Sequence, residues 1–237
     1  MLPKSFIFLF AFFLFTLPAH GSESICFGRP GHGALQNGAQ LPNSGANFSA
    51  YSHLAATLGR TYVHSEVKTI LLAAYTELEK TAPGKVFVYG ETGFKKGGRL
   101  RPHRTHQNGL SVDFMVPVMD QHKKSVPLPC SPLNRFGYDI EFDKNGKYKD
   151  LSIDFEAMAE HLYQLFLQTE KQGKKIALVI FDPDLLPFVF ATERGAFLEK
   201  NLPFMKGNAW VRHDEHYHVD FDVPCKPMKK QETGFGK

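Results

Sequence analysis

Two stretches of the chain, Leu110-Ser-Val-Asp-Phe-Met-Val-Pro-Val118 and His216-Tyr-His-Val-Asp-Phe-Asp-Val223, decide the fold class. Polar residues alternate with apolar ones over Ser111-Val-Asp-Phe114 and along the second stretch, which is the pattern of a half-buried strand. In the second stretch His216 and His218 are two positions apart, so both rings project from the same face of the strand. If the two strands are neighbours in a sheet, Asp113 can face the same cavity as these histidines.

Hydrophobic periodicity predicts helices and further strands around these two stretches. Apolar residues at helical spacing follow Ser65 until Pro83-Gly84 ends the helix, and Asp154 can cap a second helix whose apolar stripe begins at Phe155. With no internal repeat and no linker, the pattern predicts a single α+β domain with a central, mainly antiparallel sheet flanked by helices. The other expected elements are strands at 85–89 and 176–181, a hairpin at Asn145-Gly146 and a short helix from Asp182-Pro183.

The first 21 residues have the features of a secretory signal peptide. Lys4 precedes an apolar run from Phe6 to Phe15, and small residues frame a cleavage site at Ala19-His-Gly21. The run is shorter than the roughly 20 apolar residues of a membrane span. We therefore expect residues 1–21 to be removed on export, leaving a mature chain without stable membrane insertion.

The composition is that of an ordinary globular protein. Hydrophobic residues make up 43% and charged residues 22%, which excludes a disordered, fibrous or multispanning protein. The formal net charge of +4 is too small for a dedicated nucleic-acid binder, so we expect no nucleic acid as a partner. Residues 22–60, rich in Gly, Asn, Pro and Ser, are expected to form an N-terminal arm that wraps the domain, or a loop, and residues 61–237 the domain itself.

The cysteines Cys26, Cys130 and Cys225 are far apart, so the sequence has no C-x-x-C metal knuckle. In an oxidising compartment one pair is expected to form a disulfide and one thiol to be left over. The sequence alone leaves all three pairings open.

Five of the eleven histidines fall in two groups, which are His103 and His106, and His213, His216 and His218. A catalytic zinc site takes three ligands of the His, Asp or Glu type and keeps a position for water. The turn at Asn108-Gly109 can bring His106 back toward the strand that carries Asp113. Three ligands and a free imidazole, without cysteine, suit a catalytic zinc ion, which activates water while the free histidine carries the proton.

Other chemistries fit these residues less well. A non-haem iron site could use the same ligand types, but it gives no reason for the additional histidines. His103-Arg-Thr105 has the H-x-T form of a two-histidine phosphoesterase, yet the second copy is missing, since His216-Tyr-His218 has no hydroxyl at that position. The sequence contains no Gly-x-Ser-x-Gly elbow and no phosphate-binding glycine loop.

Two motifs together resemble the penicillin-insensitive murein endopeptidases, zinc peptidases related to lysostaphin-type and D-Ala-D-Ala peptidases. The first is Gly97-Gly98-Arg99 followed by His103-x-x-His106-Gln-x-Gly-Leu-x-Val-Asp113, and the second is Trp210-x-x-His213-x-x-His216-x-His218-Val. Arg60-Thr-Tyr-Val-His64 is also similar to the family, so the resemblance covers most of the chain after about Gly59, although residues 119–175 lie outside its motifs.

The resemblance implies a function and a role for each histidine. His106, Asp113 and His218 would ligate Zn²⁺, His216 would be the acid–base histidine, and His213 would be a second catalytic histidine. The fold would be the small α+β domain of hedgehog and D-Ala-D-Ala peptidases. The substrate would be the D-alanine–meso-diaminopimelate cross-link of peptidoglycan, hydrolysed in the periplasm by metal-activated water.

Several questions stay open at the level of sequence. A zinc D-Ala-D-Ala carboxypeptidase or dipeptidase, or a non-catalytic zinc-containing cell-wall-binding module, is the alternative to an endopeptidase. A second metal near His103 is not decided, because Asp120-Gln-His122 does not match the family's further ligands. Trp210 can flank the cleft or fill the core. The basic residues Lys95, Lys96, Arg99, Arg101 and Arg104 can attract substrate carboxylates or form a solvated loop.

Overall fold

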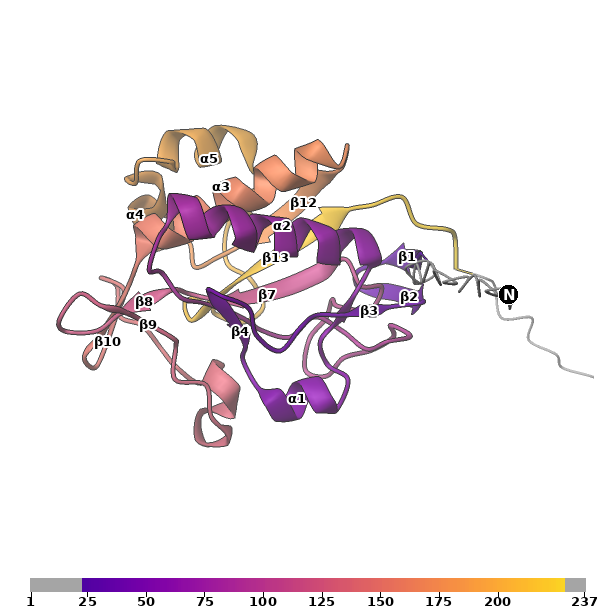
Figure 1. Cartoon of the computed structure of the whole chain (residues 1–237), viewed down its shortest axis with the longest axis horizontal. Coiled ribbons are helices and arrows are strands. Elements are labelled where there is room, and N and C mark those ends of the chain that lie inside the picture. Colours follow the sequence, from indigo (N-terminus) through magenta and orange to yellow (C-terminus); the bar gives the residue numbers. More distant parts are fainter. Residues whose placement is uncertain (1–22, 229–237) are drawn as a thin grey trace, which may run out of the picture.

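A five-stranded sheet is the centre of the structure, a computed structural model that describes residues 23–228 (Figure 1). Neighbouring strands are antiparallel except for the last pair, which is parallel. Helices cover the sheet, so the prediction of an α+β protein with a mainly antiparallel sheet is confirmed. In spatial order the strands are β12 (Lys175–Ile180), β13 (His216–Asp222), β7 (Ser111–Met115), β6 (Phe87–Tyr89) and β4 (Phe48–Ala50).

The two stretches that carry the histidines and Asp113 are adjacent strands, β13 and β7. In their antiparallel register His218 lies directly opposite Asp113, and His216 lies opposite Met115. Side chains directly opposite on neighbouring strands share a face of the sheet. The alternation of each strand therefore directs His218 and Asp113 to one face, while Tyr217 points to the other.

Two long helices pack on the face to which Tyr217 points. They are α2 (Ser65–Thr81) and α3 (Phe155–Lys171), and Figure 1 shows them side by side above the sheet. Asp154 caps α3 as predicted, since its Oδ1 accepts the Ala157 N–H at 3.1 Å. The apolar stripes of both helices are buried against the sheet, and they form the main hydrophobic core.

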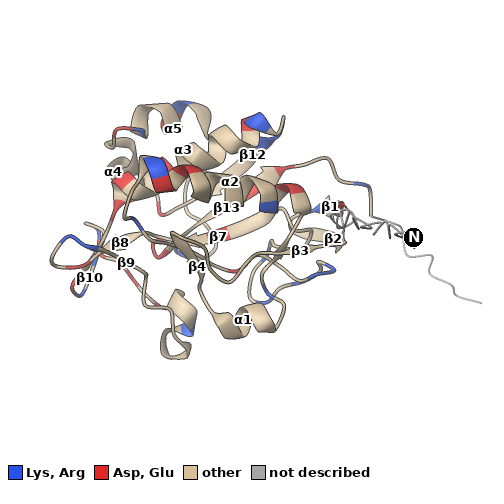
Figure 2. Ribbon diagram, in the orientation of Figure 1, with Lys and Arg blue, Asp and Glu red and all other residues tan. Residues whose placement is uncertain are grey.

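Shorter elements surround this core. Helices α4 (Leu186–Phe190) and α5 (Gly195–Asn201) lie beyond α3, while α1 (His53–Thr57) and the 3₁₀ turn η1 (Pro132–Gly137) lie on the opposite side of the sheet (Figure 1). A small four-stranded sheet has the order β10 (Lys147–Tyr148), β11 (Leu151–Ile153), β8 (Val118–Met119) and β9 (Ser125–Val126). Charged residues lie on the helices, on the loops of this small sheet and on the loops near β2 and β3 (Figure 2).

Part of the predicted N-terminal arm belongs to the central sheet, because β4 pairs with β6. The arm also contributes α1 and a hairpin of β1 (Ile25–Arg29) with β2 (His32–Gln36). Its strand β3 (Ala39–Gln40) pairs with β5 (Tyr62–Val63), which follows the arm. The predicted signal peptide, residues 1–21, lies outside the described residues. None of the helices in residues 23–228 is long and apolar enough to cross a membrane.

Two local predictions were wrong. The hairpin is not centred on Asn145-Gly146. Those residues form a turn in which the Gly146 N–H donates to the Asp143 carbonyl, and the strands β10 and β11 are joined by a later turn that contains Lys149. Asp182-Pro183 does not start a helix. Asp182 instead organises a turn in which its carbonyl accepts the Leu185 and Leu186 N–H groups, and α4 begins only at Leu186.

The structure joins Cys26 to Cys225 in a disulfide and leaves Cys130 as a free, half-buried thiol. The C-terminal segment runs beside β1, where the Gly28 N–H donates to the Lys226 carbonyl and the Lys226 N–H donates to the Cys26 carbonyl. Burial raises the pKa of the Cys130 thiol to about 12, so this cysteine is a thiol rather than a nucleophilic thiolate at neutral pH.

Removal of the disulfide is expected to destabilise the protein strongly. The cross-link spans a sequence separation of 199 residues, so it restricts the unfolded chain over nearly the whole domain. The double variant Cys26→Ala/Cys225→Ala should lose about 3–5 kcal/mol of unfolding free energy. Urea unfolding under oxidising conditions measures this loss, with Cys130→Ala as the control. Equal losses in the double variant and in Cys130→Ala would contradict the pairing of Cys26 with Cys225.

His161 on α3 sets a pH dependence of stability. Its ring is fully buried among Tyr75, Phe87, Phe114 and Tyr217, and burial lowers its pKa from 6.5 to about 3. Between these two values the unfolded chain binds a proton that the folded protein does not bind. The buried neutral His161 therefore costs no unfolding free energy above pH 6.5, and the unfolding free energy decreases as the pH falls below that value.

The variant His161→Leu should depend less on pH than the natural protein. Between pH 7 and pH 5 the natural protein should lose about 2 kcal/mol more unfolding free energy than the variant, because the variant lacks His161, which takes up a proton on unfolding. Urea titrations at the two pH values measure the difference. Parallel losses in the two proteins would show that His161 is not held neutral.

Candidate metal centre

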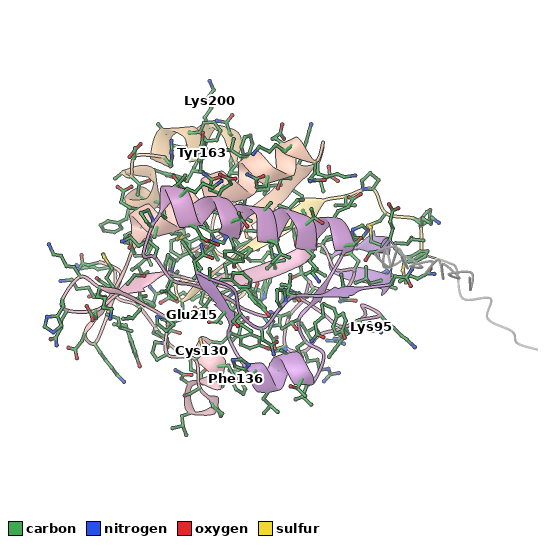
Figure 3. All side chains as sticks on the ribbon, viewed as in Figure 1. Lys95, Cys130, Phe136, Tyr163, Lys200 and Glu215 are labelled. Atoms are coloured by element: carbon green, nitrogen blue, oxygen red, sulfur yellow. A yellow bond between two sulfur atoms is a disulfide. The ribbon has the colours of Figure 1, made fainter. Side chains whose placement is uncertain are left out.

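An open cleft of about 650 Å³ lies over the face of the sheet that carries Asp113. It is on the side of the sheet where α1 and η1 lie, and Figure 3 labels Phe136 and Glu215 on this side and Tyr163 and Lys200 on the other. Asp113 is on the floor of the cleft, and Leu54, Phe136 and Trp210 are among its walls. The histidines that line it are His103, His213, His216 and His218.

The carboxylate of Asp113 is the centre of this arrangement and is inaccessible to solvent. Its Oδ1 lies 3.2 Å from Nε2 of His106 and 2.8 Å from Nδ1 of His218. Its Oδ2 lies 3.7 Å from Nδ1 of His103 and 3.9 Å from Nε2 of His216. Four imidazoles from two distant segments of the sequence therefore converge on one buried carboxylate, two at each oxygen.

The contacts of His106 and His218 show which ring nitrogen of each faces Asp113. Nδ1 of His106 lies 3.1 Å from the Thr92 carbonyl oxygen, which only accepts, so this nitrogen carries the proton. Nε2 of His106 is buried and has no hydrogen-bond partner within residues 23–228. Both ring nitrogens of His218 face carboxylates, with Nδ1 2.8 Å from Asp113 Oδ1 and Nε2 2.9 Å from Asp220 Oδ1. A metal ion beside Asp113 would take the place of the proton on Nδ1.

Nε2 of His106, Nδ1 of His218 and Oδ1 of Asp113 thus face the same place. Imidazole nitrogen and carboxylate oxygen are ligands that zinc accepts, and metal-binding histidines typically donate the other N–H to a carbonyl or a carboxylate, as His106 and His218 do here. The buried Nε2 of His106 is an orphaned atom that a metal ion would satisfy. The residues present therefore fit a zinc ion.

His103 is an alternative third ligand in the same cluster. His103, His106 and Asp113 offer ligand atoms that all lie within 4.8 Å of one another, which is a group able to hold a metal ion. Since both sets contain His106 and Asp113, they differ only in whether His218 or His103 is the third ligand. The predicted set of His106, Asp113 and His218 stays a prediction.

The backbone that presents His106 is unusual. His106 itself has a positive φ of 65°, and Gly109, where φ is 78°, completes the return toward β7. A Cβ atom at Gly109 would lie 2.8 Å from the backbone nitrogen of His64, so only glycine fits this turn. The expectation that Asn108-Gly109 brings His106 back toward Asp113 is confirmed.

The charge of Asp113 follows from its neighbours. Burial opposes ionisation, but the imidazoles of His106 and His216 outweigh it and hold the pKa of the Asp113 carboxyl well below its usual range. Burial also opposes the charged form of His218, but Asp220 and Asp113 raise its pKa to about 10. Asp113 is therefore a carboxylate at neutral pH, as a metal ligand must be.

His213 and His216 lie next to each other, with ring centroids 4.5 Å apart. Nδ1 of His216 is held by Glu215 Oε1 at 2.7 Å, so its Nε2 faces Asp113. Nδ1 of His213 donates to the Val211 carbonyl at 2.8 Å. Burial lowers the pKa of both rings to about 4, so both are neutral at pH 7 and can accept a proton.

Sequence reasoning missed the network that holds His103. Nε2 of His103 lies 2.6 Å from Glu91, and Glu91 also accepts hydrogen bonds from Arg60 at 2.5 Å and from Tyr51 at 2.8 Å. Burial opposes the charge of Glu91, but His103 and Arg60 lower its pKa to about 2. These residues are far apart in the sequence and carry no spacing signal that would have joined them.

The predicted basic cluster lies mostly away from the cleft. Within the described chain the arginines that line the cleft are Arg60, Arg135 and Arg212, and each is paired with a carboxylate. Of the predicted cluster, Arg104 stacks over Trp210 with 5.6 Å from the guanidinium carbon to the ring centroid. Trp210 is 37% exposed and lines the cleft, so it flanks the cleft and does not fill the core.

The fold and the cluster define an α+β protein with a buried histidine–carboxylate group that can hold a metal at the base of an open cleft. The family model described as penicillin-insensitive murein endopeptidase matches residues 26–130 of this chain. The resemblance that the motifs indicated is therefore confirmed for this part of the chain, somewhat less than half of it. The matched region contains His103, His106 and Asp113, whereas β13 lies beyond it. No curated protein matches the chain.

The predicted ligands can be tested by metal content. The natural protein should retain about one zinc ion per chain after dialysis, because two imidazole nitrogens and Asp113 Oδ1 form a set of three ligand atoms. Each of His106→Ala, Asp113→Asn and His218→Ala should retain almost none, while His122→Ala, at an exposed histidine, should retain all of it. Elemental analysis measures the content. Loss of zinc in His103→Ala but not in His218→Ala would show that His103 is the third ligand.

Proposed function

We propose that the protein is a zinc-dependent murein endopeptidase that hydrolyses the D-alanine–meso-diaminopimelate cross-links of peptidoglycan. The observation that carries the proposal is the convergence of His106 Nε2, which has no hydrogen-bond partner within residues 23–228, and His218 Nδ1 on Asp113 Oδ1. The family match over residues 26–130 supports murein as the substrate.

Zinc, when bound by His106, Asp113 and His218, supplies an activated water and polarises the carbonyl of the scissile peptide bond. His216 faces this position with Nε2 and is the group best placed to take a proton and return it to the leaving amine. His213, whose ring packs on His216, borders the same side of the cleft and is the second histidine of the site.

The shape and lining of the cleft suit a peptide substrate. The cleft is open, so a chain that continues beyond the scissile bond can pass through it, as a cross-linked peptide must. Leu54 and Leu58 on one wall and Trp210 and Val211 on another are exposed apolar residues that can contact alanine methyl groups. Because its arginines are already paired, substrate binding depends on these apolar walls and on the histidines more than on free positive charge.

Export to the periplasm agrees with this substrate. The chain begins with a predicted signal peptide, and the disulfide between Cys26 and Cys225 is typical of a protein that matures in an oxidising compartment. The resemblance implies a peptidoglycan with diaminopimelate cross-links in the periplasm, where both features are expected.

The decisive experiment uses cross-linked muropeptide dimers as the substrate. The purified mature protein should convert dimers to monomers, and a chelator should abolish the activity until zinc is restored. Release of D-alanine from uncross-linked stem peptides, without cleavage of dimers, would indicate a carboxypeptidase instead. Tight zinc binding with no turnover of either substrate would indicate a binding module.

His216 is expected to carry the proton. The variant His216→Ala should bind zinc as the natural protein does and should lose about 10²–10⁴-fold in kcat on the dimer, the usual worth of general acid–base catalysis. Muropeptide analysis with parallel zinc titration measures both quantities. Loss of zinc in this variant, with zinc retained in His218→Ala, would exchange the two roles.

A further inference from the structure

Tyr138 lines the cleft and contacts Asp113, although it lies outside both the sequence motifs and the region that the family model matches. It follows the turn η1 and packs edge-on against two imidazoles of the site. The ring centroid of Tyr138 lies 5.6 Å from that of His103 and 5.1 Å from that of His216.

The hydroxyl of Tyr138 has two partners, and together they determine where its proton points. The Glu91 backbone N–H donates to the hydroxyl oxygen at 3.0 Å. The hydroxyl has a single proton, and it donates that proton to Oδ2 of Asp113, also at 3.0 Å. The direction is fixed because the amide can only donate and the carboxylate can only accept.

We infer that Tyr138 is a positioning residue for the metal centre, an inference that rests on the proposed zinc site. Its hydroxyl holds Oδ2 of Asp113, so that Oδ1 alone is presented between His106 and His218. A carboxylate that is held in this way binds a metal through one oxygen, and the metal keeps positions for water and substrate. Outer-shell hydrogen bonds to a ligating carboxylate commonly tune metal affinity in this manner.

The fold makes a specific space for this hydroxyl. Gly90 lies beside it, and a Cβ atom at that position would come within 2.8 Å of the Tyr138 oxygen and 3.0 Å of the Asp113 Cβ atom. Glycine at position 90 therefore lets the tyrosine and the aspartate meet.

The backbone that precedes Tyr138 is also unusual. Arg135, Phe136 and Gly137 have consecutive positive φ angles of 48°, 60° and 103°. Left-handed conformations at non-glycine residues cost free energy and persist only where other contacts hold them. Here the side-chain oxygen of Asn134 accepts the N–H groups of Ser131 and Gly137 and stabilises the turn that delivers Tyr138 to Asp113.

The variant Tyr138→Phe tests the inference, because it removes only the hydroxyl. We expect its affinity for zinc, measured by competition with a chromophoric chelator, to fall about 10–100-fold, the usual effect of losing such a partner. Tyr163→Phe, a tyrosine on the other side of the sheet, is the matched control and should bind zinc unchanged (Figure 3). Gly90→Ala, which displaces the hydroxyl, should weaken zinc binding in the same direction.

The unfolding temperature of the zinc-free variants separates positioning from a purely structural role. A structural role alone would lower this temperature in Tyr138→Phe and leave the zinc affinity unchanged, which would overturn the inference. If the natural protein itself bound no zinc, the proposed function would fail and the inference would fall with it. Zinc binding by the natural protein with equal affinity in Tyr138→Phe would overturn the inference alone.

Discussion

A carboxylate that is buried with no access to solvent is the constraint on which the rest of the structure depends. An isolated charge in the position of Asp113 would be strongly unfavourable, so its surroundings must compensate it. Imidazoles face both oxygens, and a hydroxyl donates to one of them. The two strands and the loop that supply these groups must therefore keep their register, and the remaining architecture can be understood as the support for that register.

The sheet separates this polar cluster from an apolar core. Successive side chains of β13 point to opposite faces of the sheet, so that His218 faces Asp113 while Tyr217 packs beneath α2 and α3. Because the period of a strand is two, a slip of one residue between β13 and β7 would bury His218 in the core and expose Tyr217 in the cleft. The packing of the two helices and the geometry of the cleft thus stabilise the same register.

Local patterns in the sequence predicted the features that depend on neighbouring residues. The alternation in β7 and β13, the periodicity of α2 and α3 and the Asp154 cap were all visible, and so was the turn at Gly109. Contacts between distant segments were not predictable in this way. Glu91 and Tyr138 reach the cluster only through the tertiary fold, the pairing of Cys26 with Cys225 depends on where the chain ends meet, and Asn145-Gly146 forms a turn just before the true hairpin.

A crystal structure of the zinc-loaded protein, with anomalous scattering recorded at the zinc edge, tests the central claim most directly. We predict an ion bound by Asp113 through Oδ1, by His106 through Nε2 and by His218 through Nδ1, with Tyr138 still donating to Oδ2. An ion held by His103 in place of His218, or one bound by both oxygens of Asp113, would contradict this account of the site.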